Sequence, residues 1–151
     1  DEGVCSRNML LRETDSSAFW HAARSLNLLE KIRSTGRNLA LQGELLSQKI
    51  QGNYEKVSSV EWNCFDIWDI DNRQYLLPRE RQDLCESLGI PHIKIIDKEF
   101  ILDHTVDQLL EMAEGPGVNA GVKREGLVFK ANMSHGISFK AISNSYLLKH
   151  G

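Results

Sequence analysis

The sequence predicts an α+β fold in which antiparallel sheets are flanked by helices. Segments with helical spacing of apolar residues and strand-like segments are mixed along 151 residues, without the regular strand–helix–strand repeat of a parallel sheet. The composition, 41% apolar and 26% charged, is that of an ordinary globular protein. The length corresponds to one domain that can bury a core.

The first predicted element is a helix. Asp15 or Ser16 can cap its start, the helix is expected to run to about Ser34, and Gly36 lies just past its end. Apolar residues at helical spacing predict the face that it buries: Phe19, Ala22, Ala23, Leu26, Leu29 and Ile32. We expect Trp20 to pack as well.

Strand-like segments follow, separated by turn signals. The two predicted strands cover about 38–46 and 60–70, with a turn at residues 51–53 between them. Asp71-Asn72 is typical of a hairpin turn, after which RQYLL (73–77) pairs back.

The second half of the chain mixes two helices with three strands. Pro78 is expected to open a helix that ends at Gly89, and Thr105 is expected to cap the other helix. Residues 115–121 (GPGVNAG) are predicted to form a flexible loop. The predicted strands cover residues 90–97, 124–131 and 137–142.

The distribution of charge is more informative than its sum. A net charge of −3 does not indicate a nucleic-acid-binding protein. Residues 1–114, however, carry 13 basic and 20 acidic side chains (net −7), whereas residues 115–151 carry five basic and one acidic (net +4). A cationic C-terminal third suits phosphate recognition. The alternative is a chance cluster on a solvated face.

Cysteine content and hydropathy indicate the cellular location that we expect. Cys5, Cys64 and Cys85 are odd in number and have no C-x-x-C spacing, which favours reduced thiols and excludes a zinc site of that kind. No stretch approaches the ~20 apolar residues that span a bilayer. The first residues lack the basic and apolar regions of a secretory signal. We therefore expect an intracellular, cytoplasmic protein with no membrane partner.

Acidic residues within apolar, strand-like runs are the main functional signal. Glu44, Asp66 and Glu125 each lie in such a run, where a carboxylate is costly to bury without a partner, a metal or a ligand. Lys140 repeats the pattern with a cation. Three acids and a lysine suit a metal-bound polyphosphate. The simpler readings are structural: a strand-edge acid for Glu44, a turn-bonding or buried-network acid for Asp66, an ion pair of Glu125 with Arg124 or Lys123, and a surface lysine for Lys140. Strict alternation puts Glu125 and Lys130 on opposite faces, so a shared pocket needs a bulge or the reach of a strand-end lysine.

Alternation also predicts the surroundings of the first two acids. Gly43, beside Glu44, would leave room for a ligand to approach the backbone. Phe65 would share a face with Ile67 and offer a surface on which an aromatic base could stack. Asp66 would point to the opposite face.

Five motifs in a fixed order resemble those of the covalent nucleotidyltransferase superfamily. The motifs are SRN (6–8), QGELL (42–46), FDI (65–67), EGLVFK (125–130) and SFKAISNSYLLK (138–149). Their order and spacing most resemble the ATP-dependent RNA ligases, in the branch with an OB module N-terminal to the catalytic domain. The resemblance spans the whole chain and implies an ATP-grasp-like nucleotidyltransferase core.

The resemblance also implies a role for particular residues. Four would bind the nucleotide: Arg7 at the nucleotide or at a substrate phosphate, Glu44 at the ribose hydroxyl, Phe65 stacked on adenine, and Asp66 beside it. Three would be catalytic: Glu125, which would hold a divalent metal, with Lys130 and Lys140 at the α-phosphate. ATP (AMP in the intermediate) and Mg²⁺ or Mn²⁺ are the implied cofactors. Lys149 is expected to be a surface residue.

The sequence departs from the family in one defining element. No K-x-D-G motif, whose lysine becomes adenylated, occurs in it. We therefore expect residues 1–151 to be a partial nucleotidyltransferase domain, truncated on its N-terminal side just after the nucleophile. The parent would join RNA 3′-OH and 5′-phosphate ends, in a nicked duplex. The alternatives are a nucleotide- or RNA-binding relic without chemistry, a related DNA ligase, or a capping-type enzyme.

Overall fold

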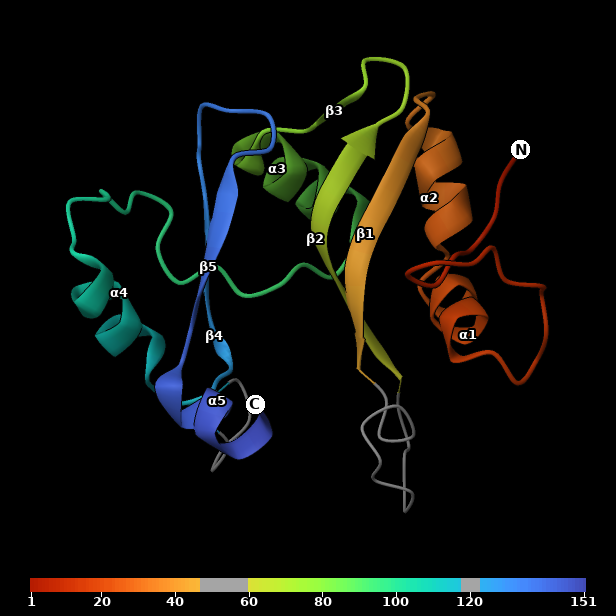
Figure 1. The fold of residues 1–151 in the computed structure, drawn as a ribbon. Helices are drawn as coiled ribbons and strands as arrows, with labels where there is room; N and C mark the ends of the chain where they lie inside the picture. Colours follow the sequence, from red (N-terminus) through yellow and green to blue (C-terminus); the bar gives the residue numbers. More distant parts are fainter. Residues whose placement is uncertain (47–59, 118–122) are drawn as a thin grey trace. The chain divides into compact units, whose positions relative to one another are not determined.

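The structure is a computed structural model that describes residues 1–46, 60–117 and 123–151 (Figure 1). Within them, the chain divides into two compact units, Asp1–Lys94 and Ile95–Gly151. We describe each unit by itself. The predicted turn at 51–53 and most of the predicted loop at 115–121 lie outside the described residues.

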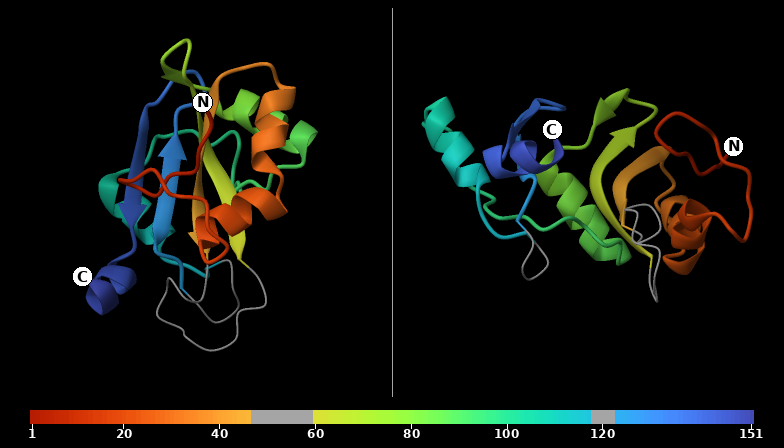
Figure 2. Two further views of the ribbon diagram at one scale, coloured as in Figure 1. Left: turned by 90° about the vertical axis from the view of Figure 1, so that its right-hand side faces the viewer. Right: turned by 60° about the horizontal axis from the view of Figure 1, so that its bottom comes forward.

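The first unit combines a small antiparallel sheet with three helices, as the α+β prediction requires. The sheet has the order β1-β2-β3. Its strands are β1 (Leu39–Leu46), β2 (Glu61–Asp69) and β3 (Gln74–Tyr75), and its helices are α1 (Ala18–Ser25), α2 (Leu28–Ser34) and α3 (Pro78–Leu88). Figure 2 shows these elements from two further sides. The helix at Pro78 ends at Gly89, whose left-handed backbone (φ 63°) confirms that part of the prediction.

The single helix predicted up to Ser34 is wrong, because the segment forms two helices. Asn27 takes a left-handed backbone (φ 53°) and separates α1 from α2. Asparagine tolerates that conformation better than most residues. The first helix is capped by Ser17, whose hydroxyl accepts a hydrogen bond from the backbone N–H of Trp20. Trp20 is buried as expected, and the break places Leu28, outside the predicted stripe, in the core.

The core of the first unit joins the sheet to α2 and α3. Its buried members are Leu28, Leu39, Cys64, Ile67, Leu76, Cys85 and Ile90. All three cysteines are free thiols; Cys64 and Cys85 are buried and Cys5 is exposed. A hydrogen bond with Cys85, together with burial, raises the pKa of Cys64.

The predicted hairpin turn at Asp71-Asn72 is confirmed and is held by a carboxylate at the end of β2. Asp69 accepts hydrogen bonds from the backbone and side-chain N–H groups of Asn72, at 3.0 and 2.8 Å, and from Arg37 at 3.1 Å. These donors, with Asn72 first, lower the pKa of Asp69 to about 2. The turn therefore depends on an ionised Asp69.

The strand predicted at 90–97 is wrong. Only an isolated parallel bridge, between Cys64 and His92, links this segment to the sheet. The backbone N–H of Cys64 donates to the Pro91 carbonyl over 2.8 Å, and that of Ile93 donates to the Cys64 carbonyl over 3.0 Å. Pro91 has no N–H to donate to the sheet, which disfavours regular pairing at the start of this segment.

The second unit is a two-stranded antiparallel hairpin with two helices. Its elements are α4 (Val106–Ala113), β4 (Gly126–Lys130), β5 (Ser138–Ile142) and α5 (Asn144–His150). Thr105 and Gln108 form a reciprocal capping box at the start of α4, which confirms the predicted cap. Helix α5 was not predicted, although its signals are in the sequence: Ser143 caps it, and Lys149 and His150 lie in its last turn.

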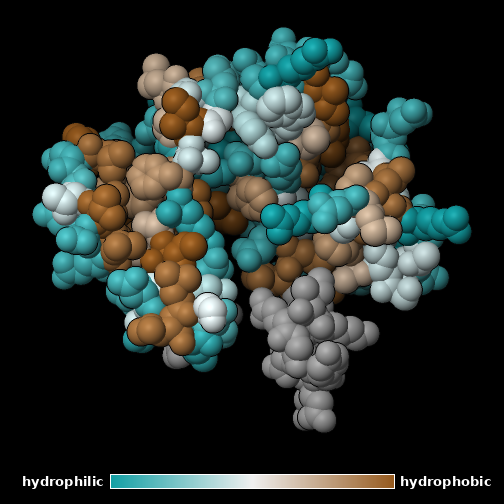
Figure 3. Space-filling model, viewed as in Figure 1, coloured by the Kyte–Doolittle hydropathy of each residue, from teal (hydrophilic) through white to brown (hydrophobic). Residues whose placement is uncertain are grey.

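Several large apolar side chains remain at the surface of the second unit, among them Ile101, Met133 and Leu148. Figure 3 shows apolar patches between polar ones on the face that it presents. In the described part of the chain, no helix is long and apolar enough to cross a membrane.

Candidate functional site

A β-bulge lies at the start of the FDI motif. Gln42 of β1 pairs with Asp66, but the next residue, Gly43, pairs with Cys64, so Phe65 is an extra residue in β2. Cys64 and Ile67 both lie in the core and are 0% exposed. Strict alternation, which places Asp66 and the residue two before it, Cys64, on the face opposite Ile67, therefore fails here, because the bulge shifts the register by one residue. Phe65 is partly exposed at this bulge.

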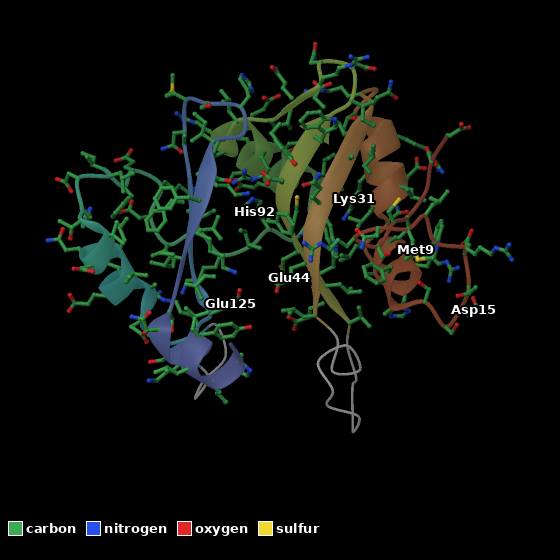
Figure 4. All side chains as sticks on the ribbon, viewed as in Figure 1. Met9, Asp15, Lys31, Glu44, His92 and Glu125 are labelled. Carbon is green, nitrogen blue, oxygen red and sulfur yellow. The ribbon has the colours of Figure 1, made fainter. Side chains whose placement is uncertain are left out.

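The sequence suggested that Gly43, beside Glu44, leaves room for a ligand, but the space where a side chain would lie is occupied. A Cβ atom added to Gly43 would lie 2.2 Å from the indole of Trp62 and 2.6 Å from the backbone oxygen of Asn63. The space at Gly43 is therefore filled by the tryptophan ring. Glu44 pairs with Asn63 and is exposed on β1, where Figure 4 labels it.

Asp66 contacts a buried arginine that the sequence analysis did not single out. Oδ1 of Asp66 accepts a hydrogen bond from Arg81 over 3.3 Å, and the side chains are 23% and 2% exposed, respectively. Nε of Arg81 also donates to Nε2 of His92 over 2.9 Å. Burial lowers the pKa of Arg81, and the nearby Asp66 carboxylate opposes that shift. No local pattern in the sequence indicates this group, because its three residues come from β2, from α3 and from the segment after α3.

Arg7 lies in an exposed turn near the start of the chain. The backbone N–H of Ser6 donates to the Met9 carbonyl over 2.9 Å, and a bridge joins Cys5 to Leu10 around it. The turn holds the SRN motif at the surface of the first unit. Arg7 therefore has the exposure that a phosphate-binding side chain needs.

The second unit brings together the acid and the lysines of the last two motifs. The Lys140 ammonium forms an ion pair with the Glu125 carboxylate, and the two side chains are 40% and 47% exposed. Lys140 pairs with Val128 across the hairpin, and Lys130 pairs with Ser138, so the two lysines lie on one face of the hairpin. Glu125 precedes the first residue of β4 and is free of strict alternation. Strand alternation therefore does not fix the face of Glu125 relative to that of Lys130.

Arg124 places this acid, and it does not form the structural ion pair with Glu125 considered above. Its Nε donates to the Ala113 carbonyl over 3.0 Å, and its guanidinium also bonds the carbonyls of Met112 and Glu114. These carbonyls belong to the last two residues of α4 and to its C-cap, and helix-end carbonyls otherwise lack partners. The side chain of Arg124 thus anchors the start of the EGLVFK motif to the end of a helix.

A second connection fixes Glu125 from the other strand. Its carbonyl accepts a hydrogen bond from the backbone N–H of Ser143, over 2.8 Å, just past β5. Glu114 accepts from the backbone N–H of Ser145 over 2.9 Å, at the start of α5. That bond lowers the pKa of Glu114. The start of β4 and the end of β5 are therefore both linked to helices.

Lys149 is exposed in the last turn of α5, as expected.

The predicted site residues fall into two groups that each unit holds separately. The first unit carries Arg7, Glu44, Phe65 and Asp66, and the second carries Glu125, Lys130 and Lys140. The described residues contain no group of three His, Cys, Asp or Glu side chains that could hold a metal by themselves. A divalent ion held by one carboxylate, with substrate phosphates and water completing its shell, fits the accessible Glu125.

The antiparallel α+β fold, with Lys130 and Lys140 on one face of its β4–β5 hairpin, is that of the nucleotidyltransferase class. A family model described as RNA ligase matches residues 1–142. The chain belongs to the RNA ligase family. Its fold is the nucleotidyltransferase fold of that family, which confirms the predicted fold class.

Solved structures of an RNA ligase from Naegleria gruberi show the same similarity. The structure with PPi is 51% identical to this chain with a TM-score of 0.90, and it covers 98% of this chain and 45% of its own. A mutant with ATP and Mn is 50% identical with a TM-score of 0.89, covering 98% and 44%. A mutant with AMP and Mn is 51% identical with a TM-score of 0.89, covering 98% and 45%. The chain thus spans less than half the length of these relatives. The comparison with curated proteins finds no match.

Proposed function

We propose that the chain is part of the nucleotidyltransferase domain of a longer ATP-dependent RNA ligase, which joins RNA 3′-OH and 5′-phosphate ends in a nicked duplex. One observation carries the proposal: about half of the residues, over 98% of the chain, are identical to an RNA ligase solved with ATP, AMP and PPi. The missing K-x-D-G motif and the partial coverage of the relatives support a longer parent. The three free thiols support a cytoplasmic location.

The first unit would bind the nucleoside. Glu44, exposed on β1, would accept hydrogen bonds from the ribose hydroxyls. Phe65, partly exposed at the bulge of β2, would stack on adenine. Arg7 would contact a phosphate, and Asp66, held by Arg81, would support the bulge beside the base.

The second unit would act on the phosphates. Lys130 and Lys140 lie on one face of the hairpin, where compact ammonium charges can meet the α-phosphate and stabilise charge that develops on it. Glu125 would supply a carboxylate oxygen to Mg²⁺ or Mn²⁺. Once bound, the ion neutralises charge on the leaving pyrophosphate. Until then, the Lys140 ammonium compensates the Glu125 carboxylate.

The reaction that these residues would serve is adenylyl transfer. A lysine amine of the parent attacks the α-phosphorus of ATP, loses a proton, and displaces pyrophosphate as the P–O bond breaks. An oxygen of the RNA 5′-phosphate then attacks the same phosphorus, the P–N bond breaks, and the lysine leaves as an amine that takes up a proton. Finally, the RNA 3′-OH attacks the activated 5′-phosphate and displaces AMP, with loss of the hydroxyl proton.

The test is self-adenylation of the full-length protein with α-labelled ATP. We expect a labelled band that Glu125→Ala abolishes at saturating Mg²⁺, and that Glu111→Ala, at an exposed acid of α4, leaves intact. The 151-residue chain alone, without K-x-D-G, should give no band. A full-length protein that binds ATP without being labelled would favour the non-catalytic alternative, and label retained by Glu125→Ala would make Glu125 structural.

A further inference from the structure

The bulge that carries Phe65 is fixed by backbone bonds on one side. Both backbone groups of Cys64, the residue before Phe65, are bonded to the segment after α3: its N–H to the Pro91 carbonyl and its carbonyl to the Ile93 N–H. Cys64 itself is fully buried. The start of the bulge therefore cannot move unless the 91–93 segment moves with it.

Side chains fix the other side of the same bulge. Arg81 donates to Asp66, the residue after Phe65, and to His92, the residue between Pro91 and Ile93. The bonds close a ring from Cys64 through the 91–93 segment, His92 and Arg81 to Asp66. Phe65 is the residue of β2 that the ring encloses. Figure 4 labels His92 beside the strands of the first unit.

The ring requires one tautomer of His92. An arginine side chain can only donate, so Nε2 of His92 must be the acceptor. The proton is then on Nδ1, which lies 2.7 Å from the Ile93 carbonyl and donates to it. His92 is thus held from both ring nitrogens, and Arg81, 2% exposed, is held by two acceptors.

We propose that Arg81 and His92 are positioning residues for nucleotide binding, which hold the β2 bulge so that Phe65 is preset to stack on the base. The inference rests on the proposed function. Neither residue needs to contact ATP, because each acts through Phe65. A buried arginine with two specific acceptors suits this task better than an apolar residue, since its planar guanidinium fixes the direction of both bonds.

The experiment measures single-turnover self-adenylation of the full-length protein over a range of ATP concentrations. We expect Arg81→Met and His92→Leu to raise the half-saturating ATP concentration about tenfold, the equivalent of losing one aromatic–base stack, with a smaller effect on the maximal rate. His92→Gln, which keeps an acceptor at the reach of Nε2, should stay within about threefold of wild type.

A structural control separates positioning from general destabilisation. Leu28→Ala removes a core side chain of the same unit that is outside the ring. At equal loss of thermal stability it should leave the half-saturating ATP concentration near that of wild type. If Arg81→Met does not fold, the comparison of His92→Leu with His92→Gln tests whether the ring positions Phe65.

Three outcomes would overturn the inference. The first is an ATP dependence in the ring variants that matches Leu28→Ala. The second is a loss in His92→Gln as large as that in His92→Leu. The third is a wild-type protein that is never labelled, which would overturn the proposed function itself and is recognised before any variant is made.

Discussion

Gly43→Ala tests whether the glycine before Glu44 serves a ligand or the packing of a tryptophan. The added methyl carbon would lie 2.2 Å from the Trp62 indole and 2.6 Å from the Asn63 backbone oxygen, whereas ordinary contact begins at 3.4 Å. The indole would have to retreat by about 1.2 Å and the carbonyl by about 0.8 Å, the differences between those distances. A ring can rotate away, but a backbone oxygen beside the bulge moves only with its strand.

The cost follows from these displacements. Overpacking of this kind costs about 1–3 kcal/mol, and replacing a strand glycine returns roughly 0.5–1 kcal/mol by lowering the entropy of the unfolded chain. The midpoints of these two ranges differ by about 1 kcal/mol, so we expect a net loss of about 1 kcal/mol in the free energy of unfolding. Urea denaturation followed by tryptophan fluorescence measures it directly.

A second substitution separates the two clashes. Trp62→Leu in the Gly43→Ala background removes the indole, so the double variant should be more stable than the sum of the single effects predicts, by about 0.5–1.5 kcal/mol. Gly36→Ala is the control, because nothing lies within 4 Å of its added carbon and only its positive φ of 65° is strained. Unchanged stability in Gly43→Ala, together with a large loss of ATP affinity, would refute this reasoning and restore the ligand-approach interpretation.

Three further predictions concern the second unit. In the full-length protein, Lys140→Ala should slow single-turnover self-adenylation roughly 10²–10³-fold, because a charge acting in the transition state is lost. Lys149→Ala, at an exposed lysine, should change the rate little, and equal losses would mean that the last motif is misplaced. Arg124→Met leaves the last carbonyls of α4 without their donor and should cost about 1–3 kcal/mol in urea unfolding. A neutral effect there would show that water replaces the guanidinium. Glu114 has a lowered pKa because the Ser145 N–H bonds its carboxylate, so it stabilises the fold above its ordinary pKa of 4.5 and loses that effect as the pH falls below 4.5. Glu114→Gln should flatten the acid limb of a pH-dependent melting curve, and an unchanged limb would contradict this.

Local patterns in the sequence were sufficient to predict most helices and strands and to recognise the order of the motifs. The strands at 38–46 and 60–70 are observed as Leu39–Leu46 and Glu61–Asp69, and the helix from Pro78 ends at the predicted Gly89. These features depend on neighbours in the chain: a proline at a helix start, a glycine after its end, and apolar runs between turns. The family resemblance rested on the same kind of information and was confirmed.

Only the tertiary structure decided how the site residues are held. The bulge at Phe65 depends on pairing between strands, since nothing within FDI shows that Gly43 pairs with Cys64 while Gln42 pairs with Asp66. A one-residue shift reverses every later side chain, which is why alternation failed there.

The side-chain partners of the site were equally beyond local reasoning. Asp66 meets Arg81 across 15 positions of the chain, and Lys140 meets Glu125 across the same number. The sequence by itself determined which charged groups the protein carries and in what order they occur. Tertiary pairing decided which of them meet, because the free energy of an ion pair depends on distance and burial, and neither is a property of the local sequence.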